Sequence, residues 1–234
     1  MSKLQKFVDS FPWVSNDTVP FTKLEKELKD CTVSIVSTAG IYQDGDEPYK
    51  IENREDVDES FRTIPSDAYY SDLEICHEHF NKDYAKKDLN VIYPVRLLEK
   101  LRDEGFIKEV AKENYSISGY IPKPNKLFDS AKTIAKKMKE QDVDIALIVP
   151  VWPICQQSGG LVAREIEKNG ISTVTFNLIP EIISIIGIPR AITLRAPFGC
   201  IIGRPCNEGK QLHCLKKALE FVKSSTVPNE IFKI

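Results

Sequence analysis

Residues 144–176, DIALIVPVWPICQQSGGLVAREIEKNGISTVTF, decide the fold. The opening run DIALIVPV is almost continuously apolar, which predicts a strand buried on both faces of a sheet. The pattern then predicts a helix that begins near Ser158, covers 161–169 and ends at Gly170, followed by a second strand over 172–176. A strand, a helix and a strand in this order form the repeating unit of a parallel sheet covered by helices.

The same alternation continues on both sides of this segment. Further strands are predicted at 31–37, 61–65, 115–120 and 191–194, and further helices at 94–104, 127–140 and 210–223. Pro65 marks the second of these strands as an edge strand, because proline cannot donate a ladder hydrogen bond. The sequence therefore predicts a three-layer α/β fold with a mostly parallel, twisted sheet and helices on both faces, of the Rossmann-like or flavodoxin-like type.

The 234 residues contain no internal repeat and no linker that would mark a boundary between domains. We expect a single α/β domain over 1–234, with a polar N-terminal leader at 1–30. The segment 43–60 is rich in charged residues and is expected to be a surface loop.

Charge and cysteine usage exclude several classes of function. The 32 Lys and Arg residues against 34 Asp and Glu residues leave a net charge of -2, so no broad basic field is available for nucleic acid or anionic lipid. No apolar stretch is long and uninterrupted enough to suggest a membrane span. The six cysteines are scattered rather than dense, which predicts a cytoplasmic protein with reduced thiols.

The segment Trp152–Gly160 leaves the most apolar strand and enters the predicted helix. In parallel sheets ligands bind beyond the carboxyl ends of the strands, so this segment is the first candidate site. A thiol at Cys155 would lie near a positive helix end and free backbone N–H groups, which favour a thiolate. The alternative is that Cys155 is a small buried filler of the core.

A second polar cluster, Cys76-His77-Glu78-His79, is followed by Asp88 and Asn90. Cysteine, histidine and carboxylate groups can bind zinc, but this spacing matches no standard zinc pattern, and no metal is expected. General acid–base chemistry or substrate binding by His77, His79, Asp88 and Asn90 is the functional interpretation. A solvated loop with a polar network is the alternative.

Motifs along most of the chain resemble those of one family, the selenoprotein B subunits of glycine, sarcosine, betaine and D-proline reductases, and especially the shorter homologues nearest the D-proline reductase subunit. They occur in order as TVSIVSTAG (32–40), FRTIP (61–65), HEHF (77–80), DLNVIYP (88–94), LRDEGFI (101–107), YSISGYI (115–121), WPICQQS (152–158) and PRA (189–191). Several motifs in the right order are far more specific than any one of them alone.

The resemblance implies a selenocysteine-x-x-cysteine redox motif in which Cys155 matches the cysteine and Trp152 matches the selenocysteine. Two explanations of Trp152 are open. Selenocysteine is encoded by UGA, so tryptophan can be a substitute at a recoded codon; alternatively, Trp152 is genuine and the selenol is lost. The family role implied for Cys155 is the resolving thiol, and Gln156, Gln157 and Ser158 beside it are candidate substrate-binding residues with the histidine cluster.

The function that the resemblance implies is reductive cleavage of the C–N bond of a small amine or amino-acid-type substrate. In that family a partner subunit holds the substrate on a pyruvoyl group, and a thioredoxin-like dithiol is the electron donor, so we expect an oligomer and no cofactor bound by this chain except selenocysteine at position 152. Two alternatives are a non-catalytic assembly homologue and a cofactor-independent racemase or lyase that uses Cys155 and Cys200.

Overall fold

The computed structural model describes residues 3–234 and contains an eight-stranded sheet and a separate two-stranded sheet. The large sheet has the order β10-β9-β8-β7-β1-β6-β3, with β5 also paired with β1. Its strands are β1 (Thr32–Ser37), β3 (Phe61–Pro65), β5 (Glu109–Val110), β6 (Glu113–Ile117), β7 (Ile145–Val149), β8 (Ser172–Asn177), β9 (Arg190–Thr193) and β10 (Glu230–Lys233). All neighbours are parallel except β3, which runs antiparallel to β6 at the edge.

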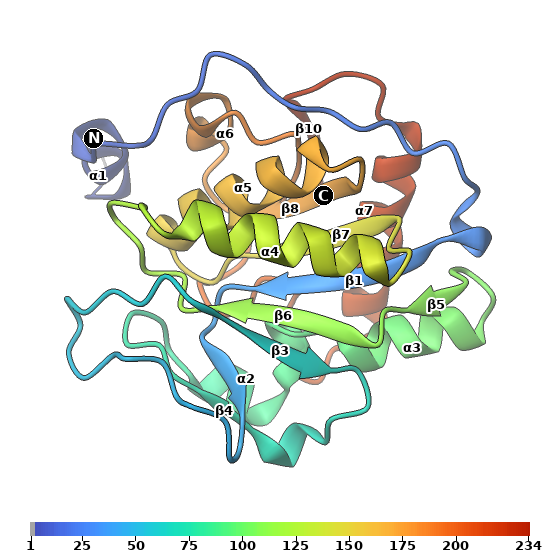
Figure 1. The fold of residues 1–234 in the computed structure, drawn as a ribbon, viewed down its shortest axis with the longest axis horizontal. Helices are drawn as coiled ribbons and strands as arrows, with labels where there is room; N and C mark the ends of the chain where they lie inside the picture. Colours follow the sequence, from blue (N-terminus) through green and yellow to red (C-terminus); the bar gives the residue numbers. More distant parts are fainter. Residues whose placement is uncertain (1–2) are drawn as a thin grey trace.

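Helices cover both faces of this sheet (Figure 1). The helices α3 (Val95–Asp103) and α7 (Glu208–Ser224) pack on one face, and α4 (Leu127–Glu140), α5 (Pro153–Lys168) and α6 (Glu181–Ile186) pack on the other. The predicted mostly parallel α/β fold with two helical layers is confirmed.

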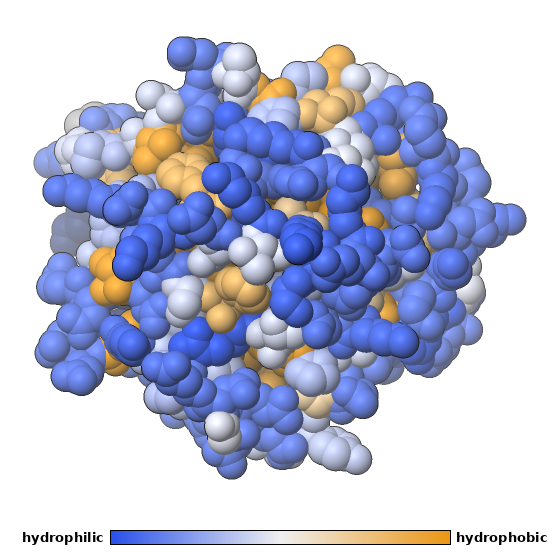
Figure 2. Space-filling view, in the orientation of Figure 1, coloured by the Kyte–Doolittle hydropathy of each residue, from blue (hydrophilic) through white to orange (hydrophobic). Residues whose placement is uncertain are grey.

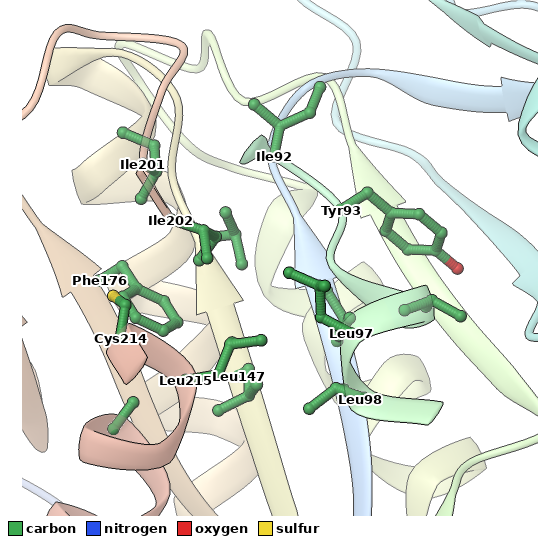
Figure 3. Close-up of a cluster of buried hydrophobic side chains, with 14 of the residues drawn as sticks. Ile92, Tyr93, Leu97, Leu98, Leu147, Phe176, Ile201, Ile202, Cys214 and Leu215 are labelled. Atoms are coloured by element: carbon green, nitrogen blue, oxygen red, sulfur yellow. The ribbon is translucent and has the colours of Figure 1, made fainter. Parts of the chain in front are cut away.

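The core on the α3 and α7 face is built from residues that are far apart in the sequence. Figure 3 shows Leu98 of α3, Leu147 of β7, Phe176 of β8 and Leu215 of α7 pointing toward one another. All four side chains are fully buried. Truncating one such leucine to alanine costs about 2–5 kcal/mol, because the lost contacts leave a cavity.

Most predicted elements are confirmed, but the start of α5 is not near Ser158. The helix begins at Pro153, so that the whole segment 153–160 is helical. The Gly159-Gly160 pair is typical of a loop in sequence, yet here it allows close packing: a Cβ on Gly159 would lie 2.9 Å from a methyl group of Ile148.

Another strand boundary differs from the prediction. The strand β6 ends at Ile117, two residues before Gly119, rather than continuing to residue 120. Gly119 has a φ of +79°, which turns the chain out of the sheet.

Several short elements were not predicted. They lie in the N-terminal segment, in the long connection from β1 to α3, between β8 and β9, and at the C-terminus: α1 (Lys3–Ser10), β2 (Ile41–Gln43), β4 (Leu73–Ile75), α2 (Asp83–Lys87), α6 and β10, with the 3-10 turns η1 (Leu28–Asp30), η2 (Tyr70–Asp72) and η3 (Leu89–Val91). The strands β2 and β4 pair antiparallel and form the small sheet.

The expected leader and surface loop are more closely attached to the body than their composition suggests. Val8 and Leu24 in the N-terminal segment are buried. In the charged segment Tyr49 is buried, and its hydroxyl donates to the carbonyl oxygen of Ser116 over 2.7 Å. Apolar and aromatic residues spaced among the charges therefore hold both segments against the sheet.

The face of the molecule shown in Figure 2 is largely hydrophilic, and its hydrophobic residues form small separate patches. Within residues 3–234, no helix has the length and hydropathy needed to cross a membrane.

Candidate functional site

The candidate site lies where the order of the parallel strands reverses. The connection from β1 leads through α3 to β6 on one side, and the connection from β7 leads through α5 to β8 on the other. The carboxyl ends of β1 and β7 are neighbours, and their extensions are joined: Thr38 N–H donates to Val149 O over 3.1 Å, and Val151 N–H donates to the Thr38 hydroxyl oxygen over 3.1 Å. Such a switch point is where open α/β sheets bind their ligands.

Cys155 lies at this switch point, in the first turn of α5, but its thiol is not exposed. Burial raises the pKa of Cys155 to about 12, although hydrogen bonds from Thr38 and from the backbone of Trp152 and Val151 act in the opposite direction. The expectation of an accessible thiol is therefore wrong, and burial favours the protonated form over the expected thiolate. Loss of hydration outweighs the favourable helix N-terminus and its N–H groups.

His77 covers the sulfur. Its Nε2 lies 3.2 Å from Cys155 Sγ, and its side chain is 1% exposed. Burial lowers the pKa of His77 to about 3, so the imidazole is neutral at physiological pH. The structure thus joins two residues from the separate sequence clusters into one buried pair.

An aromatic cover lies over this pair, and we define it as His79, Phe80, Tyr120, Trp152 and Phe198. His79 stacks on Tyr120 with ring centroids 3.8 Å apart, and Trp152 packs against Phe198 at 5.2 Å. The ring of Phe80 is 4.9 Å from that of His77. A narrow crevice lined by His77, His79 and Tyr120 lies beside the pair, and it is too tight to admit a water molecule.

Two glycines allow this close packing. Gly40, after β1, has a φ of +64°, and a Cβ there would lie 2.1 Å from the carbonyl oxygen of Cys76. Gly119, after β6, has a φ of +79°, and a Cβ there would lie 2.8 Å from Cys155 Sγ. Only glycine combines a left-handed backbone with so close an approach, so these two positions bring the His77 segment and the end of β6 onto the sulfur.

Asp88 and Asn90, which were predicted to bind substrate, make structural contacts away from Cys155. Asp88 accepts hydrogen bonds from the backbone N–H of Asn90 over 3.1 Å, from Cys206 N–H over 2.8 Å and from Gln211 Nε2 over 2.7 Å. Asn90 Oδ1 accepts from the Tyr70 hydroxyl over 3.0 Å. Asp88 thus caps η3 and ties it to the segment that precedes and begins α7.

The polar residues after Cys155 are all buried in α5. Gln157 accepts from Val14 N–H over 2.8 Å, and Ser158 donates to Gly119 O over 2.8 Å. Gln156 accepts from Leu178 N–H over 3.1 Å, whereas its Nε2 has no hydrogen-bond partner among residues 3–234. These side chains fasten α5 to neighbouring segments, and their predicted contact with substrate stays a prediction.

Sequence reasoning missed three residues that shape the site: Thr38, Gly119 and Phe198. Thr38 and Gly119 follow β1 and β6, so their place at the carboxyl edge could have been inferred from the strand pattern. Phe198 follows β9 in an irregular segment, which the hydrogen bond from Gly199 N–H to Val151 O, 3.1 Å, and the packing of Phe198 on Trp152 bring to the site. No local sequence pattern predicts this contact between the segment after β9 and the segment after β7.

Comparison with known proteins identifies relatives of this chain. The family model for the glycine/sarcosine/betaine reductase selenoprotein B matches residues 2–150. The D-proline reductase subunit gamma of Acetoanaerobium sticklandii is 33% identical over 192 residues, which cover 82% of this chain and 78% of that protein. No solved structure matches the chain.

More distant relatives are longer. A glycine reductase complex component B subunit gamma of Carboxydothermus hydrogenoformans is 24% identical over 220 residues, or 93% of this chain and 50% of that protein. A betaine reductase complex component B subunit beta of Peptoclostridium acidaminophilum is 26% identical over 244 residues, or 98% of this chain and 54% of that protein. The chain thus spans about half of these two relatives. The family match covers more than half of the sequence and agrees with the 33% identical relative, so the chain belongs to the glycine/sarcosine/betaine reductase selenoprotein B family.

Proposed function

We propose that this chain is the B-type subunit of a reductase complex that cleaves the C–N bond of a small amine or amino-acid-type substrate. Residue 152 and Cys155 are its redox pair, and the catalytic form carries selenocysteine at position 152, where this sequence has tryptophan. The family model matches only residues 2–150, so the assignment of the pair comes from the resemblance of the WPICQQS motif, and the geometry of α5 is compatible with it.

One observation carries the proposal: residue 152 is the N-cap of α5 and Cys155 lies in its first turn. Residues three apart at a helix start share a face, so a chalcogen at position 152 would lie near Cys155. Residue 152 is half-buried, whereas Cys155 is completely covered. This asymmetry suits a pair in which the outer residue attacks the substrate and the inner thiol acts only afterwards.

The chemistry divides into two displacements. In the first, the selenolate at position 152 forms a bond to the α-carbon of the substrate, and the C–N bond breaks with its electron pair leaving on nitrogen. In the second, the Cys155 thiolate attacks selenium, the carbon leaves and takes up a proton, and a selenenyl sulfide forms. An external dithiol then supplies the two electrons that reduce this bond. A partner subunit with a pyruvoyl group would present the amine substrate, as the family resemblance implies.

The test is to place a chalcogen at position 152. We expect the Trp152→Cys variant to form an intramolecular disulfide with Cys155 under mild oxidation, detected by peptide mass spectrometry, and to be reduced by a thioredoxin-like dithiol. The matched control, Trp152→Cys with Cys155→Ser, cannot form it. A folded Trp152→Cys variant in which Cys155 never pairs with residue 152 would contradict the proposal.

A second candidate function is a non-catalytic assembly subunit of the same kind of complex. The packing of the Trp152 indole against Phe198 supports it, since an indole is no nucleophile and here fills part of the cover. The codon for residue 152 separates the candidates. UGA, with selenium found at this position in the native protein, favours catalysis, whereas UGG and a tryptophan mass favour assembly.

The third expectation, a racemase or lyase using Cys155 and Cys200, gains no support, because burial raises the pKa of both thiols.

A further inference from the structure

The hydrogen bonds around His77 determine which of its ring nitrogens carries the proton. The backbone N–H of His79 donates to His77 Nδ1 over 3.1 Å. A nitrogen that accepts a hydrogen bond offers a lone pair, so Nδ1 carries no proton. In a neutral imidazole the single proton must then be on Nε2, the nitrogen that lies 3.2 Å from Cys155 Sγ.

We infer that His77 is a fixed hydrogen-bond donor to the Cys155 sulfur, held in the Nε2–H tautomer by the backbone of His79, and that it stabilises the Cys155 thiolate rather than removing its proton. A histidine beside a cysteine is usually interpreted as a base. That role requires a lone pair on the nitrogen that faces the sulfur, and here that nitrogen bears the proton. The catalytic part of this inference rests on the proposed function, in which the Cys155 thiolate attacks selenium at position 152. The hydrogen bond from His77 would stabilise that thiolate.

Other groups near the sulfur also favour its anionic form. The Thr38 hydroxyl and backbone groups of Trp152 and Val151 lower the pKa of Cys155, as hydrogen bonds to an anionic sulfur do. These contributions favour the thiolate, whereas burial favours the protonated thiol. The charged or titratable groups acting on His77 are His79 and Lys82, and both further disfavour its protonation.

The position of His79 is itself fixed. Its ring stacks on Tyr120, and its Nε2 lies 2.8 Å from the carbonyl oxygen of Arg54, which can only accept. His79 is thus the donor in two directions. Its ring donates to the Arg54 carbonyl oxygen, and its backbone N–H donates to His77, which in turn donates to Cys155. Because the segment is held at both ends, the tautomer of His77 is set before any substrate binds.

The tautomer can be read directly from the unmodified chain. In protein labelled with ¹⁵N-histidine, two-bond ¹H–¹⁵N correlations show which nitrogen of each ring is protonated. We expect His77 as the neutral Nε2–H form throughout pH 6–8, while the exposed His213 provides the reference ring. A proton on Nδ1, or an imidazolium at His77 in this range, would overturn the inference. The result does not depend on whether residue 152 carries a chalcogen, so it is separate from the test of the proposed function.

Two matched variants test the role of the donor. The amide of His77→Gln reaches the position of Nε2, and that of His77→Asn reaches only the position of Nδ1. Neither is a base at pH 8. We expect iodoacetamide to label Cys155 about tenfold to a hundredfold more slowly in His77→Asn than in His77→Gln, which should stay near the wild-type rate, because a hydrogen bond to a charged group is lost. Labelling is followed by peptide mass spectrometry with Cys31 as an internal reference. Equally slow labelling in both variants would show that a base is needed and would overturn the inference.

Discussion

Acidification from pH 7 to pH 5 should destabilise this protein through His77. The unfolded chain has an ordinary histidine pKa of 6.5, whereas burial lowers the folded value to about 3. The folded state therefore binds fewer protons between these two values, and the stability that the neutral ring contributes is present above pH 6.5 and is lost as the pH falls toward 3. At pH 5, about 1.5 below the unfolded pKa, and at 1.36 kcal/mol for each pH unit, the loss is about 2 kcal/mol.

Urea unfolding at the two pH values measures this loss. Because His79 is shifted in the same direction, the informative quantity is the difference between the wild type and His77→Gln, which cannot titrate. We expect the wild type to lose about 2 kcal/mol more than the variant, and His213→Gln, a change at an exposed ring, to behave as the wild type. If the wild type and His77→Gln lost equal stability, His77 would not be buried in neutral form, and the reasoning would be refuted.

Three further changes have defined outcomes in the same unfolding assay. Gly119→Ala should cost several kcal/mol more than Gly105→Ala, because both have a positive φ but only the Cβ at position 119 meets other atoms; equal losses would show that the site is not closely packed there. Arg190→Met should lower the free energy of unfolding by about 3–5 kcal/mol, since it leaves Glu167 buried without its ion-pair partner. The double variant, with both residues changed to methionine, should recover much of that stability. A double variant as unstable as Arg190→Met would show that the unpaired charge is not the cause of the loss. Asp88→Ala should cost about 1–3 kcal/mol by removing four hydrogen bonds, without changing the labelling of the Cys155 thiol; a change in that labelling would show that Asp88 acts on the site.

Much of the fold follows from local patterns. The apolar run of β7 and the amphipathic spacing of α3 and α4 identify these elements, because buried strands and half-buried helices impose different periods on the sequence. The start of α5 could not be predicted in this way. Pro153 suits the first position of a helix, but Gly159 and Gly160 have low helix propensity, and their close packing against Ile148 of β7 and against Ile188 after α6 favours the helical conformation there.

The sequence by itself determined the class of fold, the family, and the place of Cys155 near the carboxyl end of a central strand. Tertiary structure decided its surroundings. His77 is 78 residues away from Cys155, and it reaches the sulfur only because the connection from β1 to α3 folds back over the sheet edge. The same packing decided the protonation state, since the pKa of a thiol depends on hydration and on donors from Thr38 and the α5 backbone, which no local pattern specifies.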